Sequence, residues 1–162
     1  MLDRYAGAAR EYKAEAIVRI TADCPLIDPE ISDSVVSEFV QRRADYASNI
    51  LPRTYPRGLD TEVFTRDALE QAWKHATEAH QREHVTPYLY EHPQVFRLAS
   101  IQADAEYAYY RWTLDTQEDL ELIRSIYSRF DGRERFSWRE LLQLFEREPA
   151  LVEINSHVQQ AV

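Results

Sequence analysis

The feature that most constrains the fold is an alternation of short runs rich in β-branched residues with longer segments of helical period. Residues 16–21 (Ala-Ile-Val-Arg-Ile-Thr) form one such run, and residues 46–48 form a second. Further strands are predicted at residues 59–65, 95–101 and 110–114. Strands that alternate with helices favour an α/β fold in which a sheet lies between helices.

Helices are predicted between and after these strands. The clearest start is Asp28-Pro29-Glu30, which supplies an N-cap, a first-turn proline and a first-turn acid. The other helices are expected at residues 2–13, 67–77, 116–130, 138–146 and 149–160. No internal repeat, low-complexity tract or flexible linker interrupts the pattern, so residues 1–162 are predicted to form a single domain.

Composition excludes several classes of protein. The net charge of −9 argues against a basic surface that binds nucleic acid, and a 44% hydrophobic share is too high for a disordered chain. Only Cys24 is a cysteine, which excludes a disulfide scaffold or a multi-cysteine zinc site and fits a reducing compartment. No apolar run is long enough to span a membrane, and no leader pattern is present, so we expect a cytoplasmic protein.

Glycine usage limits how the chain can handle a nucleotide. Gly7, Gly58 and Gly132 are the only glycines and stand far apart, whereas loops that wrap backbone amides around phosphates usually need clustered glycines. A phosphate-binding loop is therefore not expected within these residues. A sheet without its first strands would leave an open edge, so we also expect a missing N-terminal piece or a partner that covers it.

Two aspartates are candidate magnesium ligands. Asp23 follows the first predicted strand, and Asp115 precedes the helix at 116–130. Each also has a purely structural interpretation: Asp23 as a turn cap, and Asp115 as an N-cap whose capping box would be completed by Glu118. Taken together, two carboxylates at strand ends could hold one Mg²⁺ from two sides, leaving positions for water and phosphate oxygens.

A third pattern, His80-Gln-Arg-Glu-His84, matches the zinc motif of inverted zincin peptidases. That chemistry needs both histidines on one face of an unbroken helix, with an acidic third ligand further along the chain. Pro87 predicts a helix that begins near Glu83 and leaves His80 outside it. The zinc interpretation is therefore disfavoured.

The irregular stretch at residues 49–62 contains mixed charges beside a tyrosine, typical either of a specificity loop or of a solvated surface loop. Arg53, Arg57 and Arg82 are the residues expected to meet an anionic substrate group, because a guanidinium pairs with two oxygens of a carboxylate or phosphate. Cys24 has no base beside it in sequence and is expected to be a buried, inert thiol.

Four ordered blocks carry a resemblance to a known family. They are RITADCPLID at 19–28, RTYPRGLDTEVF at 53–64, REHVTPY at 82–88 and RWTLDTQED at 111–119, followed by INSHV at 154–158. These blocks resemble the spore coat polysaccharide (SpsF-like) branch of the cytidylyltransferases, which is related to the acylneuraminate and Kdo cytidylyltransferases.

The resemblance implies a GT-A-like α/β sandwich with a mixed, mostly parallel sheet and helices on both faces. It implies transfer of CMP from CTP to a sugar acid, release of pyrophosphate, Mg²⁺ held by Asp23 and Asp115, and a homodimer. Residues of the sugar pocket or subunit interface would be Arg53, Tyr55, Arg57, Asp60, Glu62, Arg82, Glu83, His84 and Thr86.

Relatives of this kind begin with a strand and a Gly- and Arg-bearing loop that holds CTP. By resemblance, these residues correspond to the C-terminal two thirds of such an enzyme, without its N-terminal strands. The alternative function is a non-catalytic fragment that acts as an oligomerisation or partner-binding module.

Overall fold

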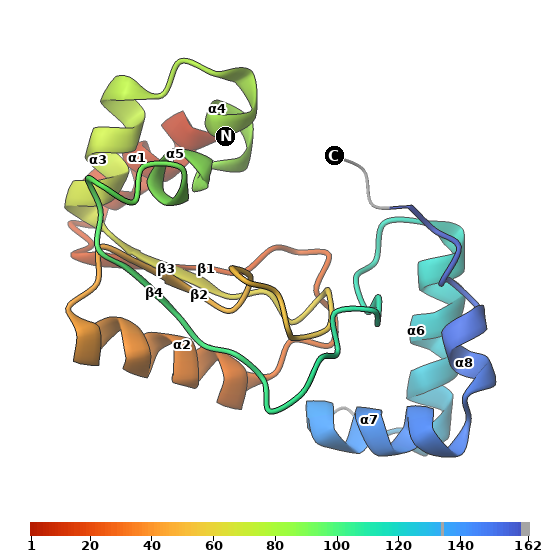
Figure 1. Cartoon of the computed structure of the whole chain (residues 1–162). Coiled ribbons are helices and arrows are strands. Elements are labelled where there is room, and N and C mark those ends of the chain that lie inside the picture. The colour runs from red at the N-terminus through yellow and green to blue at the C-terminus, as the bar shows by residue number, and fades with distance from the viewer. Residues whose placement is uncertain (134, 160–162) are drawn as a thin grey trace. The chain divides into compact units, whose positions relative to one another are not determined.

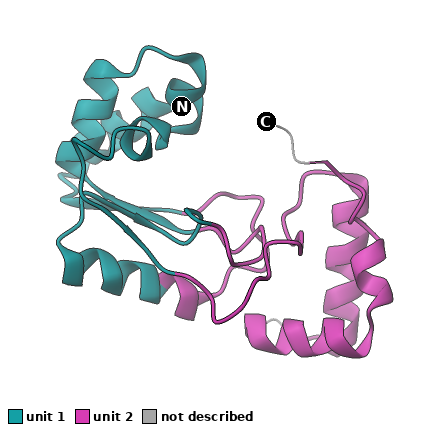
Figure 2. Cartoon of the chain, viewed as in Figure 1, with its two compact units in different colours: residues 1–19, 33–52, 61–101 teal, residues 20–32, 53–60, 102–162 magenta. Residues whose placement is uncertain are grey.

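A computed structural model describes residues 1–133 and 135–159. The chain forms two compact units, each assembled from three segments (Figure 2). Unit 1 comprises residues 1–19, 33–52 and 61–101, and unit 2 comprises residues 20–32, 53–60 and the chain from 102 onward. The segments of the two units interleave along the sequence. The expectation that residues 1–162 form a single domain stays a prediction.

Unit 1 contains a mixed four-stranded sheet with the order β1-β3-β2-β4. The strands are β1 (Ala16–Arg19), β2 (Tyr46–Ser48), β3 (Glu62–Thr65) and β4 (Leu98–Ser100). Strand β3 is antiparallel to both β1 and β2, whereas β2 and β4 are parallel. The mixed sheet is confirmed, but the expectation of mostly parallel pairing is wrong, because the reversed strand β3 lies between two strands of the opposite direction.

Helices cover both faces of this sheet, as predicted (Figure 1). They are α1 (Leu2–Glu11), α3 (Arg66–His75), α4 (Ala79–His84) and α5 (Pro87–Tyr90) on one side and α2 (Pro29–Arg42) on the other. Alternation along the strands directs Tyr46 and Phe64 into the core beneath α1 and α3. Their neighbours Ala47 and Val63 face the opposite way and pack with Val35 of α2.

Strand β1 is an edge strand that leaves apolar surface open. Its one partner among the described strands is β3, with Val18 opposite Val63. Val63 is buried under α2, but Val18 is 50% exposed. The β1 edge therefore presents both unpaired backbone groups and an uncovered apolar side chain among the described residues.

Unit 2 contains the helices α6 (Gln117–Arg129), α7 (Trp138–Arg147) and α8 (Ala150–Glu153). Phe145 of α7 packs against Tyr110 and Trp112, with ring centroids 5.1 and 5.4 Å apart. The strand predicted at 110–114 is wrong, because its backbone pairs with a loop: Arg57 donates its amide to the Tyr110 carbonyl and accepts from the Trp112 amide.

Two further helix boundaries differ from prediction. Helix α4 includes both His80 and His84, so the expected start near Glu83 is wrong. The chain breaks instead at Val85, whose φ of +77° ends α4 before Pro87 opens α5. The last helix, expected at 149–160, ends at Glu153, and residue 160 lies outside the described residues.

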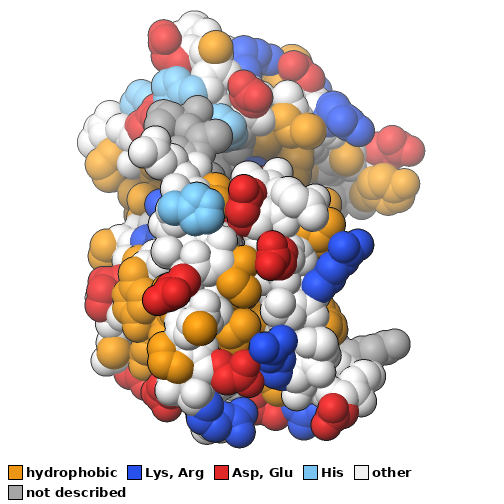
Figure 3. Space-filling view, turned by 90° about the vertical axis from the view of Figure 1, so that its right-hand side faces the viewer, with side chains coloured by type: hydrophobic (Ala, Val, Ile, Leu, Met, Phe, Trp, Pro, Cys, Tyr) orange, Lys and Arg blue, Asp and Glu red, His pale blue; other side chains and the backbone are white. Residues whose placement is uncertain are grey.

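Within the described ranges, every helix is too short or too polar to pass through a lipid bilayer. On the face that Figure 3 shows, acidic and basic side chains are interspersed with hydrophobic ones. No broad area of a single charge is visible on that face.

Candidate functional site

The two candidate aspartates lie on adjacent, hydrogen-bonded segments of unit 2. The Asp23 carbonyl accepts hydrogen bonds from the Leu114 amide at 2.9 Å and from the Thr113 hydroxyl at 3.1 Å. The Thr113 hydroxyl also lies 3.2 Å from Oδ2 of Asp23. Since Asp115 directly follows Leu114, the tertiary structure brings together two residues that are far apart in sequence.

The environment of Asp23 favours its ionised form. Burial alone would raise the pKa of this carboxyl group, but hydrogen bonds from the Thr21 hydroxyl, its own backbone amide and the Thr113 hydroxyl lower it below the usual value. The neighbouring Cys24 is buried, as predicted, and burial raises the pKa of its thiol to about 11. Asp23 is therefore ionised at neutral pH, while Cys24 stays protonated.

The cap of helix α6 differs from the predicted one by a single residue. Thr116, not Asp115, is the N-cap, and its capping box is completed by Asp119, not Glu118. The carboxylate of Asp115 is consequently not used by the cap. It is 42% exposed and lies 2.8 Å from Nη2 of Arg111, so this acidic group remains available at the surface of unit 2.

Asp119 is a fully buried carboxylate that the sequence analysis did not single out. Its Oδ1 accepts from Arg111 Nε (2.9 Å) and Asn155 Nδ2 (2.8 Å). Its Oδ2 accepts from Arg111 Nη2 (2.8 Å) and from the amides of Asp115 and Thr116 (both 3.0 Å). These hydrogen bonds outweigh burial and hold the pKa of Asp119 well below its ordinary value.

The loop at residues 53–60 carries two arginines, of which one, Arg57, has no ion pair among the described residues. Arg53 is engaged by Asp60 through two contacts of 2.6 and 2.7 Å, and Tyr55 is buried with its ring 5.3 Å from that of Trp138. Arg57 lines a small pocket of about 110 Å³ beside Arg111. Its guanidinium has no hydrogen bond or ion pair in the part of the chain that the structure describes.

The charge of Arg57 is also not compensated fully by its surroundings. Burial, followed by repulsion from Arg53, lowers the pKa of Arg57; the charge of Asp60 opposes this shift in part, and repulsion from Arg111 adds to it. A cation in such a position gains from binding an anion. Of the three arginines predicted to meet an anionic group, Arg57 is the one that the described structure leaves without a salt bridge.

A sequence profile described as Cytidylyltransferase matches residues 1–151 of the chain. The chain belongs to the cytidylyltransferase family. It is 39% identical over 163 residues to an uncharacterized protein of Methanocaldococcus jannaschii, a match that covers 99% of this chain and 65% of that protein. It is 32% identical over 152 residues to the spore coat polysaccharide biosynthesis protein SpsF of Bacillus subtilis, with 92% of this chain and 62% of SpsF covered.

A solved structure of another member of the family is also similar to this chain. A cytidylyltransferase from Leptospira borgpetersenii serovar Hardjo-bovis superposes with a TM-score of 0.88 at 34% identity. That match covers 99% of this chain and 66% of the Leptospira chain. The chain therefore spans slightly less than two thirds of the length of each of these relatives.

The other residues implicated by resemblance lie in unit 1. Glu62 is buried and accepts hydrogen bonds from Arg19, from the Tyr46 hydroxyl at 2.8 Å and from the Thr86 hydroxyl at 2.6 Å. Arg82 contacts Asp3 at 2.7 Å. The structure brings Glu62 and Thr86 into one network.

The remaining two members of that set are exposed. Glu83 and His84 lie on the surface of α4. The other histidine of that helix, His80, contacts Glu91 at 2.8 Å. No three His, Cys, Asp or Glu side chains in residues 1–133 and 135–159 form a group that could hold a metal ion.

The donor set of Asp23 and Asp115 fits magnesium. Mg²⁺ is commonly bound through one or two carboxylates, with water and substrate phosphates as the remaining ligands. Asp23 and Asp115, which lie on adjacent segments, carry donors of this kind.

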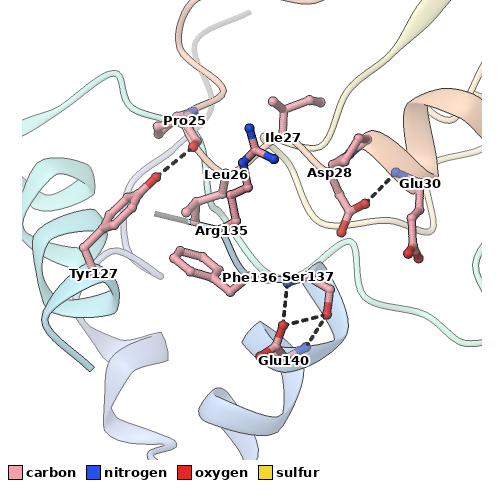
Figure 4. Close-up of a pocket in the computed structure, with 11 residues that line it drawn as sticks. Pro25, Leu26, Ile27, Asp28, Glu30, Tyr127, Arg135, Phe136, Ser137 and Glu140 are labelled. Atoms are coloured by element: carbon pink, nitrogen blue, oxygen red, sulfur yellow. Dashed lines mark hydrogen bonds between the residues drawn. The ribbon is translucent and has the colours of Figure 1, made fainter. Parts of the chain in front are cut away.

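The loop that carries Asp23 is anchored at its far end by Asp28. Its Oδ1 accepts from the Glu30 amide at the start of α2, and its Oδ2 accepts from the Trp138 amide at the start of α7, both at 2.8 Å. Figure 4 shows Asp28 beside a pocket of about 650 Å³, where the Tyr127 hydroxyl donates to the Pro25 carbonyl. The segment after Asp23 is thus tied to both α6 and α7.

Gly58 permits the close approach of the Arg57 loop to the segment before Asp115. Its φ is +98°, and a Cβ atom at this position would lie 2.5 Å from the backbone carbon and oxygen of Trp112. No side chain fits at that distance, and L-residues disfavour that φ.

We predict that Gly58→Ala lowers the free energy of unfolding by about 2–4 kcal/mol, from backbone strain and overpacking combined. Gly7→Ala is the matched control, because Gly7 lies in α1 with nothing within 4 Å of an added Cβ. It should raise that free energy by about 0.5–1 kcal/mol. Urea unfolding followed by circular dichroism measures both, and equal effects would contradict the proposed close approach.

Proposed function

We propose that this chain supplies the metal-binding and acceptor-binding residues of an enzyme that transfers CMP from CTP to a sugar acid. Pyrophosphate would be released and the product used to build a surface polysaccharide. Family membership and the name of the Bacillus relative support the reaction class. The observation that carries the proposal is the hydrogen bond from Leu114 to Asp23, which places two aspartates on adjacent segments.

In this reaction the two aspartates would bind the metal ion and the phosphates would bind to it. Asp23 and Asp115 hold Mg²⁺, which when bound neutralises phosphate charge and orients the leaving pyrophosphate. The 2-hydroxyl oxygen of the acceptor would form a bond to the α-phosphorus of CTP while the bond from that phosphorus to the α,β-bridging oxygen breaks. Pyrophosphate leaves with the electron pair of the broken bond, and the hydroxyl proton passes to solvent water. To hold the cation, Asp115 would give up its contact with Arg111, which would remain paired with Asp119.

The substrate carboxylate would be bound by Arg57. This guanidinium lines a pocket and has no salt bridge among the described residues, whereas Arg53 is already neutralised by Asp60. A guanidinium and a carboxylate form a planar pair with two hydrogen bonds, which orients the acceptor as well as attracting it. Arg57 would therefore select a sugar acid over a neutral sugar.

We predict that Asp23→Ala and Asp115→Ala each lower the rate of pyrophosphate release by about 100-fold or more, since even indirect metal-site residues are worth 10–100-fold. The assay supplies CTP, Mg²⁺ and candidate sugar acids to this chain mixed with the N-terminal segment proposed below. Asp33→Ala, which removes an exposed carboxylate of α2, is the control and should leave the rate unchanged. Full activity in either site variant would contradict the metal role.

We expect Arg57→Ala to raise the KM for the acceptor about tenfold or more, because the variant loses a charge-assisted pair with the carboxylate. The KM for CTP should stay unchanged. Comparing the acid with its neutral amide sharpens the test. The unaltered chain should prefer the acid, and the variant should treat the two acceptors alike. A preference for the acid that survives in Arg57→Ala would assign the carboxylate to another residue.

The open edge of β1 favours a further proposal on how CTP phosphates are held. No clustered glycines occur here, and Val18 is half exposed on an edge strand. We propose that a strand of an N-terminal cytidylyltransferase segment, which also carries the phosphate loop, pairs with β1. The assembled enzyme would be a cytoplasmic homodimer.

Mixing this chain with such a segment, supplied separately, should produce pyrophosphate release. Val18→Lys, mixed at the same protein concentrations, should abolish this pyrophosphate release, because a lysine buried between β1 and the added strand is unfavourable. The exposed side chain of Val40 on α2 offers the control Val40→Lys, which should behave like the unaltered chain. A mixture that assembles but never turns over would favour the alternative function, a partner-binding module without catalysis.

A further inference from the structure

The buried carboxylate of Asp119 has a role beyond the helix cap. It lies at the centre of a network that links Arg111, the Asp115 backbone and Asn155. Asn155 comes from the segment after α8 and uses its side-chain amide twice, on Asp119 Oδ1 at 2.8 Å and on the Arg111 carbonyl at 2.9 Å. An ordinary capping box needs none of these additional partners.

Arg111 is shared unequally between two carboxylates. Asp119 holds it through two parallel contacts, Nε to Oδ1 at 2.9 Å and Nη2 to Oδ2 at 2.8 Å. Asp115 holds it through one contact of 2.8 Å at Nη2. The side chain of Asp119 is fully buried and that of Asp115 is 42% exposed, so the Asp115 contact is the weaker and more easily exchanged one.

A guanidinium beside a metal ligand works against metal binding. It competes with the cation for the carboxylate and repels the cation directly, and at partly buried positions such repulsion is only weakly screened. In this structure the charge of Arg111 is already balanced by Asp119. The negative charge of Asp115 therefore remains available to a second cation.

We propose that Asp119 is a positioning residue of the metal site: it neutralises Arg111, and so lets Asp115 exchange from Arg111 to a divalent cation. Asn155 keeps Asp119 aligned for this task from the far side. The inference rests on the proposed function, in which Asp115 is a metal ligand. It assigns a role to two residues outside the ligand pair.

The test is a Mn²⁺ titration of the 162-residue chain, followed by proton relaxation of water. Asp119→Asn should weaken Mn²⁺ binding about tenfold, the usual cost of losing an outer-shell partner. The double variant Arg111→Gln with Asp119→Asn should recover affinity to within about threefold of the unaltered chain, because the uncompensated cation is then gone. A purely structural role predicts the opposite order, with the double variant binding most weakly.

Glu140→Gln is the matched control. Glu140 occupies the same capping-box position in α7, paired with Ser137, and does not contact Arg111 or Asp115. It should leave Mn²⁺ affinity unchanged, and circular dichroism should show all variants folded at the titration temperature.

The outcomes separate the two proposals. An unaltered chain that does not bind Mn²⁺, or that binds it equally well after Asp23→Ala and Asp115→Ala, would overturn the proposed function and this inference with it. If the unaltered chain binds Mn²⁺ through both aspartates, two results would overturn the inference alone. One is an Asp119→Asn variant with unchanged affinity, and the other is a double variant that does not recover the affinity lost in Asp119→Asn. Weakening followed by recovery supports it.

Discussion

The site depends on one backbone contact, the hydrogen bond between the Leu114 amide and the Asp23 carbonyl. Neither partner belongs to a regular strand, so no extended ladder supports the pairing. The Thr113 hydroxyl reinforces the contact by donating to the same Asp23 carbonyl. The backbone of Arg57 holds the residues just before it, through the Tyr110 carbonyl and the Trp112 amide. Gly58 is what allows that second approach, because a larger residue would collide with the Trp112 backbone.

Buried carboxylates organise both units in the same physical way. Glu62 in unit 1 and Asp119 in unit 2 are almost fully excluded from water, and each is surrounded by an arginine and by neutral donors. Removing one partner from such a network leaves a buried charge uncompensated, which typically costs about 3–5 kcal/mol. Each network therefore depends on its arginine and its neutral donors being present together.

Several features were accessible from the sequence because they depend on local interactions. The strand at 46–48, helix α2 behind Asp28-Pro29-Glu30 and the helices around α1, α3, α6 and α7 follow from periodicity and capping chemistry. The identity of the α6 cap was missed by one residue, since both Asp115 and Thr116 are good N-caps. Only the neighbouring Arg111 and Asn155 decide that Asp119 is the buried partner.

By itself, the sequence determined most of the element types, the small number and wide spacing of its glycines, and the motif blocks that indicated the family. Tertiary structure alone decided the order and direction of the strands and the joining of Asp23 to the segment of Asp115. It also decided which of Arg53, Arg57 and Arg82 has no salt bridge within the described residues. The physical reason is distance along the chain. Capping and periodicity act within a few residues, whereas Thr113 meets Asp23, and Asn155 meets Asp119, only after the chain has folded.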